Sequence, residues 1–214
     1  MLTRHQVVGA FRSGRLVDSR PESLPTWRVT TAHRHIATGV GIILGGTTTE
    51  TSAGDGRRME ILTTTRRVPI IVESPDDVAS DKKQWGHNGI IHHCDGVHFL
   101  SPADRRGELC GCPKDPTDQR IQAKSGLGPH PSTTAFFRLA DRHELGIFKF
   151  HSTSWSFAET IPETRKELAG LHRNALCALS IDTVEFSPTD GGIRMRYRKP
   201  DIRVLGPWKE RINR

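Results

Sequence analysis

The chain has 214 residues, of which 35% are hydrophobic, enough for one substantial core or two small ones and too few for a large multidomain enzyme. No stretch approaches the roughly 18 to 20 consecutive apolar residues of a membrane-spanning helix, and residues 1–15 hold no apolar run of signal-peptide length. Four cysteines in a chain of this length do not suggest a disulfide scaffold. We therefore expect a soluble, cytoplasmic, basic globular protein.

The positive charge is concentrated at the two ends of the chain. The formal net charge of +7 consists of +4 in residues 1–49, −3 in residues 50–193 and +6 in residues 194–214. Basic ends favour contact with nucleic acid or another polyanion. They are equally compatible with solvated faces and tails, so charge alone does not assign a partner.

The first part of the chain predicts one helix and several short strands. Apolar residues recur at helical spacing in 32–44, followed by Gly45 and Gly46 as a C-cap. Residues 19–25, with two prolines, are expected to form a connector. Strands are expected at 27–30, 47–51, 59–65 and 68–72, with 54–56 as a turn. Pro69 favours an edge position for the last of these strands.

Residues 84–128 show little periodicity. They are rich in Gly, Pro, His and Asp and contain three of the four cysteines. A segment of this length with few apolar side chains needs another organiser, and a metal ion is the usual one.

Regular patterns return after Pro131. Two strands are expected at 135–139 and 146–151, then a helix entry and helix over 155–170, in which Pro162 is tolerable if it falls in the first turn. A hairpin of strands 178–186 and 193–197 is expected across 188–192. The predicted fold class is α+β: a mostly antiparallel sheet, two main helices and a Cys/His-rich, zinc-tied loop region. We expect one domain over 1–214, with an insert at about 84–128 and basic terminal segments.

The last predicted strand alternates apolar and basic residues. Ile193, Met195 and Tyr197 are expected on a core-facing side, and three arginines on the other. These arginines are candidates for weak DNA contact: Arg194, Arg196 and Arg198. The alternative is an ordinary solvated strand face.

A cluster of cysteines and histidines predicts a structural zinc site. Zinc prefers four tetrahedral Cys or His ligands, often supplied as two close pairs. Cys110 and Cys112 form one pair, with Gly111 allowing a tight turn, and His92 with Cys94 offers the same i, i+2 spacing. The fourth position is also open to His93 and His98. Free thiols with surface histidines are the alternative.

The remaining motifs give no support for an enzyme. Cys177 lies in an apolar stretch and is expected to be a buried free thiol. Asp95 and Glu108 are near the cysteines, but they do not stand in a recognisable catalytic motif. Residues 126–133 are glycine-rich, but their two prolines, Pro129 and Pro131, lack the N–H donors that a phosphate-binding loop requires.

Several short motifs follow one another in the order typical of one protein family. They are Cys94-Asp-Gly, Cys110-Gly-Cys-Pro113, Pro131-Ser-Thr, Phe137-Arg-Leu139, Glu144-Leu-Gly-Ile-Phe-Lys-Phe150, Ser154-Trp-Ser156, Tyr197-Arg-Lys-Pro200 and Val204-Leu-Gly206. Over roughly Leu16 to Gly206, this order resembles the larger recombination directionality factors of actinobacterial phages and prophages, which partner large serine integrases.

The resemblance implies a protein without chemistry of its own. Such a factor binds a serine integrase on attachment-site DNA, inside the bacterial host cell, and favours prophage excision over integration. It implies protein–protein contact as the main interaction, with weak, non-specific DNA contact and no small-molecule substrate. Two other functions remain open on the residues alone: a metal-dependent hydrolase and a basic accessory DNA-binding protein.

Overall fold

The computed structural model describes residues 7–18, 20–53, 56–186 and 195–209. Its helices are α1 (Arg34–Leu44), α2 (Pro116–Lys124) and α3 (Trp155–Leu171). Its strands are β1 (Val7–Val17), β2 (Arg20–Thr31), β3 (Thr47–Ala53), β4 (Gly56–Leu62), β5 (Arg67–Val72), β6 (Val78–Gly86), β7 (Gly89–Cys94), β8 (Phe99–Ser101), β9 (His130–Leu139), β10 (Ile147–Ser152), β11 (Ala175–Phe186) and β12 (Met195–Pro207). The α+β class is confirmed. None of the described helices is long and apolar enough to cross a membrane.

One branched sheet organises these strands. Its main order is β12-β11-β5-β9-β10-β1-β2-β4-β3, and β6 also pairs with β9 and carries β7 and β8. Among the described strands, β1 and β10 form the one parallel pair, so the expected antiparallel character is confirmed. The start of β9 pairs with β6 and its end with β5. The sheet therefore divides at β9, and one branch leads away into the cysteine-rich segment.

An aromatic core lies on the inner face of this sheet. Phe11, Trp27, Phe137, Phe148 and Phe150 are fully buried, with neighbouring ring centroids 5.1 to 6.4 Å apart. Burying such large side chains supplies most of the driving force for folding.

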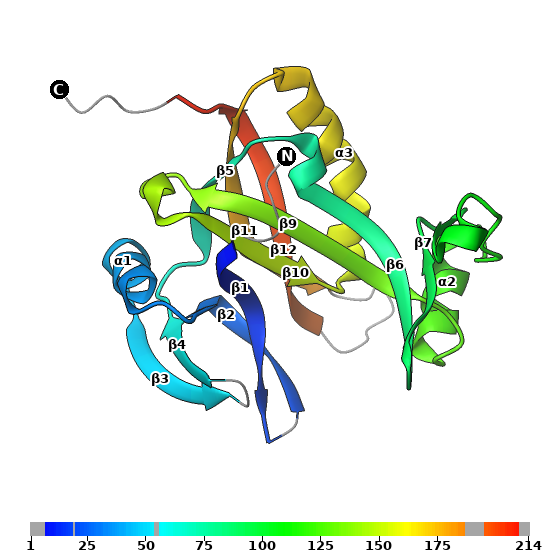
Figure 1. Cartoon of the computed structure of the whole chain (residues 1–214), viewed down its shortest axis with the longest axis horizontal. Helices are drawn as coiled ribbons and strands as arrows, with labels where there is room; N and C mark the ends of the chain where they lie inside the picture. The colour runs from blue at the N-terminus through cyan, green and yellow to red at the C-terminus, as the bar shows by residue number, and fades with distance from the viewer. Residues whose placement is uncertain (1–6, 19, 54–55, 187–194, 210–214) are drawn as a thin grey trace.

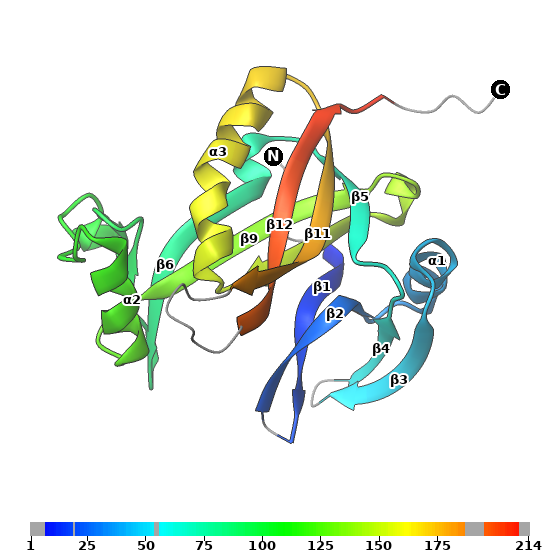
Figure 2. The ribbon, with the colours of Figure 1, turned by 180° about the vertical axis from the view of Figure 1, so that it is seen from behind.

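Helix α3 covers the core from the inner side. Its Phe157, Ile161 and Leu168 recur at helical spacing and are buried, and the Phe157 ring lies 5.7 Å from the Phe150 ring. Ser154 caps the helix by accepting a hydrogen bond from the Phe157 N–H. Figure 2 shows α3 running beside β12 and crossing in front of β9.

Both predicted main helices are confirmed, but Pro162 does not lie in a first turn, the position in which a helix tolerates proline. Helix α1 runs from Arg34 to Leu44, and its C-cap is Gly45, whose φ of 64° favours glycine. Helix α3 begins at Trp155, so Pro162 lies in its interior and not in its first turn. Proline removes one helical hydrogen bond, and the buried apolar stripe with the N-cap sustains the helix across it.

Two expectations about prolines in the sheet are also wrong. Strand β5 is central, between β11 and β9, although Pro69 predicted an edge. The Pro69 carbonyl points to the β9 side, where it accepts a hydrogen bond from the Ala140 N–H. On that side only Ile70 and Ile71 of β5 pair with β9. The N–H that Pro69 lacks is therefore missing at the end of the β5–β9 pairing, where it interrupts no further hydrogen bonds. The predicted connector 19–25 is strand from Arg20 onward, because β4 pairs only with residues 28–31 and leaves this part of β2 at an edge.

The cysteine-rich segment forms a lobe at one end of the molecule. Residues 84–128, termed the lobe below, include the end of β6, β7, β8 and helix α2. In Figure 1 the lobe lies at the opposite end of the sheet from α1, β3 and β4. The long β6–β9 pair carries it, so its side chains project beyond the main body.

Candidate metal centre

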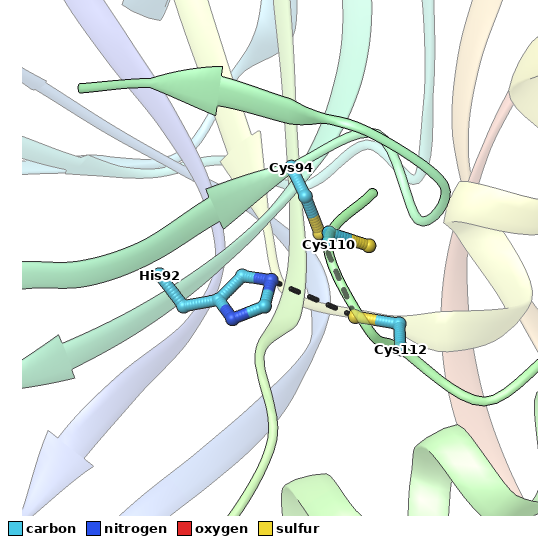
Figure 3. Close-up of side chains that lie close together, drawn as sticks. All are labelled: His92, Cys94, Cys110 and Cys112. Carbon is cyan, nitrogen blue, oxygen red and sulfur yellow. Dashed lines mark hydrogen bonds between the residues drawn. The ribbon is translucent and has the colours of Figure 1, made fainter. Parts of the chain in front are cut away.

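The four residues predicted as zinc ligands meet in the lobe. One ligand atom each from His92, Cys94, Cys110 and Cys112 lies within 4.8 Å of all the others. The Cys94 and Cys112 sulfurs are 3.7 Å apart, and Cys112 Sγ is 3.6 Å from His92 Nε2. Figure 3 shows the four side chains converging.

These separations fit a tetrahedral zinc ion. With Zn–S near 2.3 Å and Zn–N near 2.05 Å, a tetrahedron has S–S edges of about 3.8 Å and S–N edges of about 3.6 Å. Three thiolates and one imidazole are also the ligand types that zinc prefers in closed structural sites. The residues present therefore fit this ion.

Two turns bring the ligand pairs together. His92 and Cys94 are two apart on strand β7 and point to the same side. Directly after Cys94, the Asp95 carboxylate accepts from the N–H groups of Val97 and His98, each at 2.7 Å, which closes the first turn. The second turn contains Gly111 with φ of 76°, a conformation that favours glycine.

The protein part of this lobe has a very small core. Its hydrophobic cluster consists of Cys94, Phe99 and Cys110, with Cys112 packed against them, and Ala123 on α2 is buried outside that cluster. Phe99 holds the site from one side: its ring lies 4.7 Å from the His92 ring, and the Arg105 guanidinium lies 3.9 Å above it. One phenylalanine and three cysteines bury little apolar surface, so a bound ion would supply much of the stability.

The charges around the cluster favour a cation between the sulfurs. Burial and the neighbouring Cys112 raise the pKa of the Cys94 thiol far above its ordinary value, and burial also raises the pKa of Cys112. Three thiolates cannot gather here without a compensating positive charge. Lys82 supplies part of that charge, lowering the pKa of Cys112 against the effect of burial, and its Nζ is held 2.5 Å from Gln119 Oε1.

The two competing histidines have other partners. His93 lies between Ser101 Oγ and Asp81 Oδ2, 2.8 Å from each, and so connects β8, β7 and β6. His98 lies 4.0 Å from the Asp95 carboxylate. Neither belongs to the group of four that gathers among the described residues.

The other predicted residues lie apart from this cluster. Cys177 is buried in β11, as expected, and burial raises its pKa to about 12. Arg194 lies outside the described residues. Arg196 is 3.8 Å from Glu185, and Arg198 donates to the Ser23 carbonyl oxygen at 2.7 Å. The expected core position of Tyr197 is wrong, since its side chain is exposed.

Several residues that shape the site were not predicted. Helix α2 is capped by Asp115, which accepts from Thr117 N–H, and has Pro116 in its first turn. An Asp-Pro pair before a polar run is a known helix-start signal, so the sequence contained the information. Lys82 and Phe99 carry no such signal, because strand pairing alone brings them to the cluster.

Comparison with known proteins gives one family. The model of the Gp3-like family, described as recombination directionality factor-like, matches residues 8–191, which is most of the chain. No solved structure gives a significant match.

Proposed function

Since the chain belongs to the Gp3-like, recombination directionality factor-like family, we propose that it binds a serine integrase on attachment-site DNA and switches it from integration to excision. Membership of the family indicates a role connected with recombination. The proposed factor acts in the cytoplasm of the bacterial host by binding and not by catalysis. His92, Cys94, Cys110 and Cys112 hold one structural zinc ion in this proposal.

The observation that carries the proposal is the apolar surface of the lobe. Twelve large hydrophobic side chains are exposed among the described residues, and seven of them belong to the lobe. They are Trp85, Ile90, Ile91, Val97, Leu109, Ile121 and Leu127. Exposed apolar side chains of one lobe are typical of a protein-interaction site where they adjoin one another.

Part of this set lies together at the β6–β7 hairpin. Trp85 is directly opposite Ile90 in the antiparallel pair. Gln84 donates to the Gly126 carbonyl oxygen at 2.7 Å, which holds the segment with Leu127 beside the hairpin. An aromatic ring with aliphatic neighbours is the usual composition of an interface hot spot.

The charge of the lobe also favours a protein partner. It contains five Lys or Arg and five Asp or Glu residues, so its net charge is zero, whereas the whole chain carries +7. A surface that gains little from phosphate contact and exposes apolar side chains is better suited to another protein than to nucleic acid.

The cluster geometry argues against a hydrolytic metal site. A catalytic zinc usually keeps one position open for water, and a carboxylate accompanies it. Here four protein ligands converge. The Asp95 carboxylate accepts backbone N–H groups, and Glu108 pairs with Arg105 at 3.2 Å. Both carboxylates near the cysteines are engaged in local structure.

Switching an integrase needs only differential binding. A factor shifts an equilibrium by the difference between its affinities for two arrangements. Such a coupling is typically about 1–3 kcal/mol, which an interface of a few apolar side chains can supply.

The test is a recombination assay with the integrase encoded near this chain. Integration and excision substrates are incubated with integrase, with and without the purified protein. We expect the protein to raise excision and lower integration, and a protein with Cys112→Ser to do neither. Unchanged yields of both reactions with the native protein would rule out the proposed function.

A further inference from the structure

A second surface, which borders the lobe at Lys83 and lies mainly on the central strands, carries an excess of positive charge. Side chains alternate along β-strands, so residues next to the buried Phe11, Phe148 and Phe150 point to the opposite, outer face of the sheet. Residues with charged side chains on this outer face of β6, β9, β10, β1, β2 and β4 are Lys83, Arg138, Lys149, Arg12, Arg28, Arg58, Asp81 and Glu60. Six cations thus share this face with two carboxylates, and Arg138 is paired with Glu73 at 2.8 Å.

The two carboxylates are already engaged. Glu60 pairs with Arg28 at 2.5 Å, and Asp81 pairs with Lys83 at 2.9 Å. In the part of the chain that the structure describes, no carboxylate lies within ion-pair distance of Arg12 or Lys149. They lie on the neighbouring strands β1 and β10, where Lys149 pairs with Ala10. Together with His151 they line one shallow hollow.

The cations of this face repel one another. Burial lowers the pKa of Arg12, and the charges of Arg28 and Arg58 lower it further. Burial likewise lowers the pKa of His151, aided by Lys149, Lys83 and Arg12 and opposed by Asp81. Unrelieved repulsion disfavours the folded state, and a bound polyanion would relieve it.

We propose that this outer face, centred on Arg12 and Lys149, contacts the phosphate backbone of duplex DNA. Its charge is complementary to phosphate, and the contact requires no base recognition. On these strands the exposed large apolar side chains are Leu16 and Val17 at the far end of β1 and Trp85 at the lobe end of β6, so none lies in β10 or in residues 7–12. A polar, cationic surface of this kind is typical of DNA interfaces, whereas protein interfaces have an apolar centre.

The proposal moves the DNA contact away from the last strand. Arg196 and Arg198 have partners within the protein, whereas Arg12 and Lys149 do not among the described residues. The proposed contact rests on the proposed function in one respect: DNA is chosen as the polyanion because integrase acts on DNA. The lobe then remains available for the integrase while the outer face touches the DNA that the integrase holds.

The experiment measures binding of the full chain, without integrase, to a fluorescently labelled duplex of arbitrary sequence over a range of NaCl concentrations. The variant is Arg12→Gln/Lys149→Gln, which removes both charges and keeps most of the side-chain length. The control is Lys166→Gln/Arg173→Gln, which removes two exposed charges from α3 and the turn after it, on the inner side of the sheet. Circular dichroism and zinc content check that each protein is folded.

The slope of log binding constant against log salt concentration counts phosphate contacts. We expect this slope to be smaller in magnitude by about 2 in the Arg12/Lys149 variant than in the native protein, one for each lost phosphate contact. The Lys166/Arg173 control should keep a larger part of both slope and affinity, and Arg12→Lys/Lys149→Arg should restore them. An equal loss in variant and control would overturn the assignment to this face. Absence of salt-dependent duplex binding by the native protein would also overturn the assignment. In that case a loss of integrase affinity in the Arg12/Lys149 variant would assign the face to integrase instead of DNA.

These outcomes are separate from those of the recombination assay. Duplex binding by the outer face would stand even if excision did not respond to the protein. Conversely, the native protein could switch recombination while the Arg12/Lys149 variant binds duplex as well as the native protein does. That result would support the proposed function and contradict the DNA contact at the outer face.

Discussion

The sulfur atoms of Cys94 and Cys112 lie 3.7 Å apart although eighteen positions separate the two residues in the chain. That distance is close to the S–S edge of a tetrahedral zinc–thiolate site, about 3.8 Å, and far too long for a disulfide, in which the sulfurs are about 2.05 Å apart. The relationship therefore favours a metal ion over oxidation as the link between the two turns.

Loss of one ligand is expected to remove the metal and loosen the lobe. We expect about one zinc ion per chain in the native protein and close to none in Cys112→Ser, because a structural site needs its full ligand set. Chelation of the native protein should lower its thermal midpoint. Metal analysis by mass spectrometry and a thermal melt measure both effects.

The chain provides a matched control for this experiment. Cys177 is buried in β11, away from the cluster, so Cys177→Ala should retain the zinc. Its cost is that of a small core cavity, about 1 kcal/mol. Equal zinc content in native protein and Cys112→Ser would contradict the assigned ligand set.

The apolar surface of the lobe gives a second expectation. Trp85→Ala/Leu127→Ala should weaken integrase binding by about tenfold or more, since truncated hot-spot residues commonly cost at least 1 to 2 kcal/mol. Both side chains are largely exposed, at 69% and 79%, so zinc content and thermal midpoint should stay close to native values. Binding is measured by calorimetry or biolayer interferometry.

An exposed apolar residue elsewhere tests whether the effect is specific. Ile42 is 70% exposed and belongs to α1, the helix at the other end of the molecule from the lobe (Figure 1). Ile42→Ala should leave integrase binding unchanged. A loss of the same size in Ile42→Ala would show that the lobe is not the contact surface.

The three-residue network Asp81–His93–Ser101 has the composition of a hydrolytic triad, and its role can be separated from catalysis. It joins three adjacent strands, and Asp81 also holds Lys83, so we interpret it as a structural link. Ser101→Ala should lower the free energy of unfolding by about 1 kcal/mol and leave recombination switching intact. Loss of switching with unchanged stability and zinc content would instead indicate chemistry at Ser101.

The sequence predicted the parts of this structure that depend on local patterns. Apolar spacing and the glycine C-cap located α1, and the close Cys and His pairs selected the four residues that converge. The sequence did not separate His92 from His93 by spacing alone, because that choice depends on strand pairing: His93 is taken by Asp81 and Ser101 on two neighbouring strands. The edge position predicted for β5 from Pro69 was wrong for the same reason, since which residues of β5 lack a pairing partner depends on where β9 ends.

The pH dependence of stability gives the last expectation, and it concerns His151. Burial and the charges of Lys149, Lys83 and Arg12 lower the pKa of His151 in the folded protein, with Asp81 acting in the opposite direction. The unfolded chain keeps the ordinary value of about 6.5. Between the two values the unfolded state binds more protons, so stability falls as the pH falls through about 6.5 and levels off below the folded pKa.

Removing this histidine should therefore reduce the loss of folding stability that occurs as the pH falls. His151→Gln should lose less stability than native protein when the pH is lowered from about 7.5 to about 5.5, as measured by urea unfolding at several pH values with zinc present. The pKa itself is read from the His151 ring protons by NMR. It should rise in Lys149→Gln, because one of the repelling charges is gone. An unchanged His151 pKa in that variant, or a parallel pH profile for His151→Gln and native protein, would contradict the crowding of positive charge that we assign to the outer face.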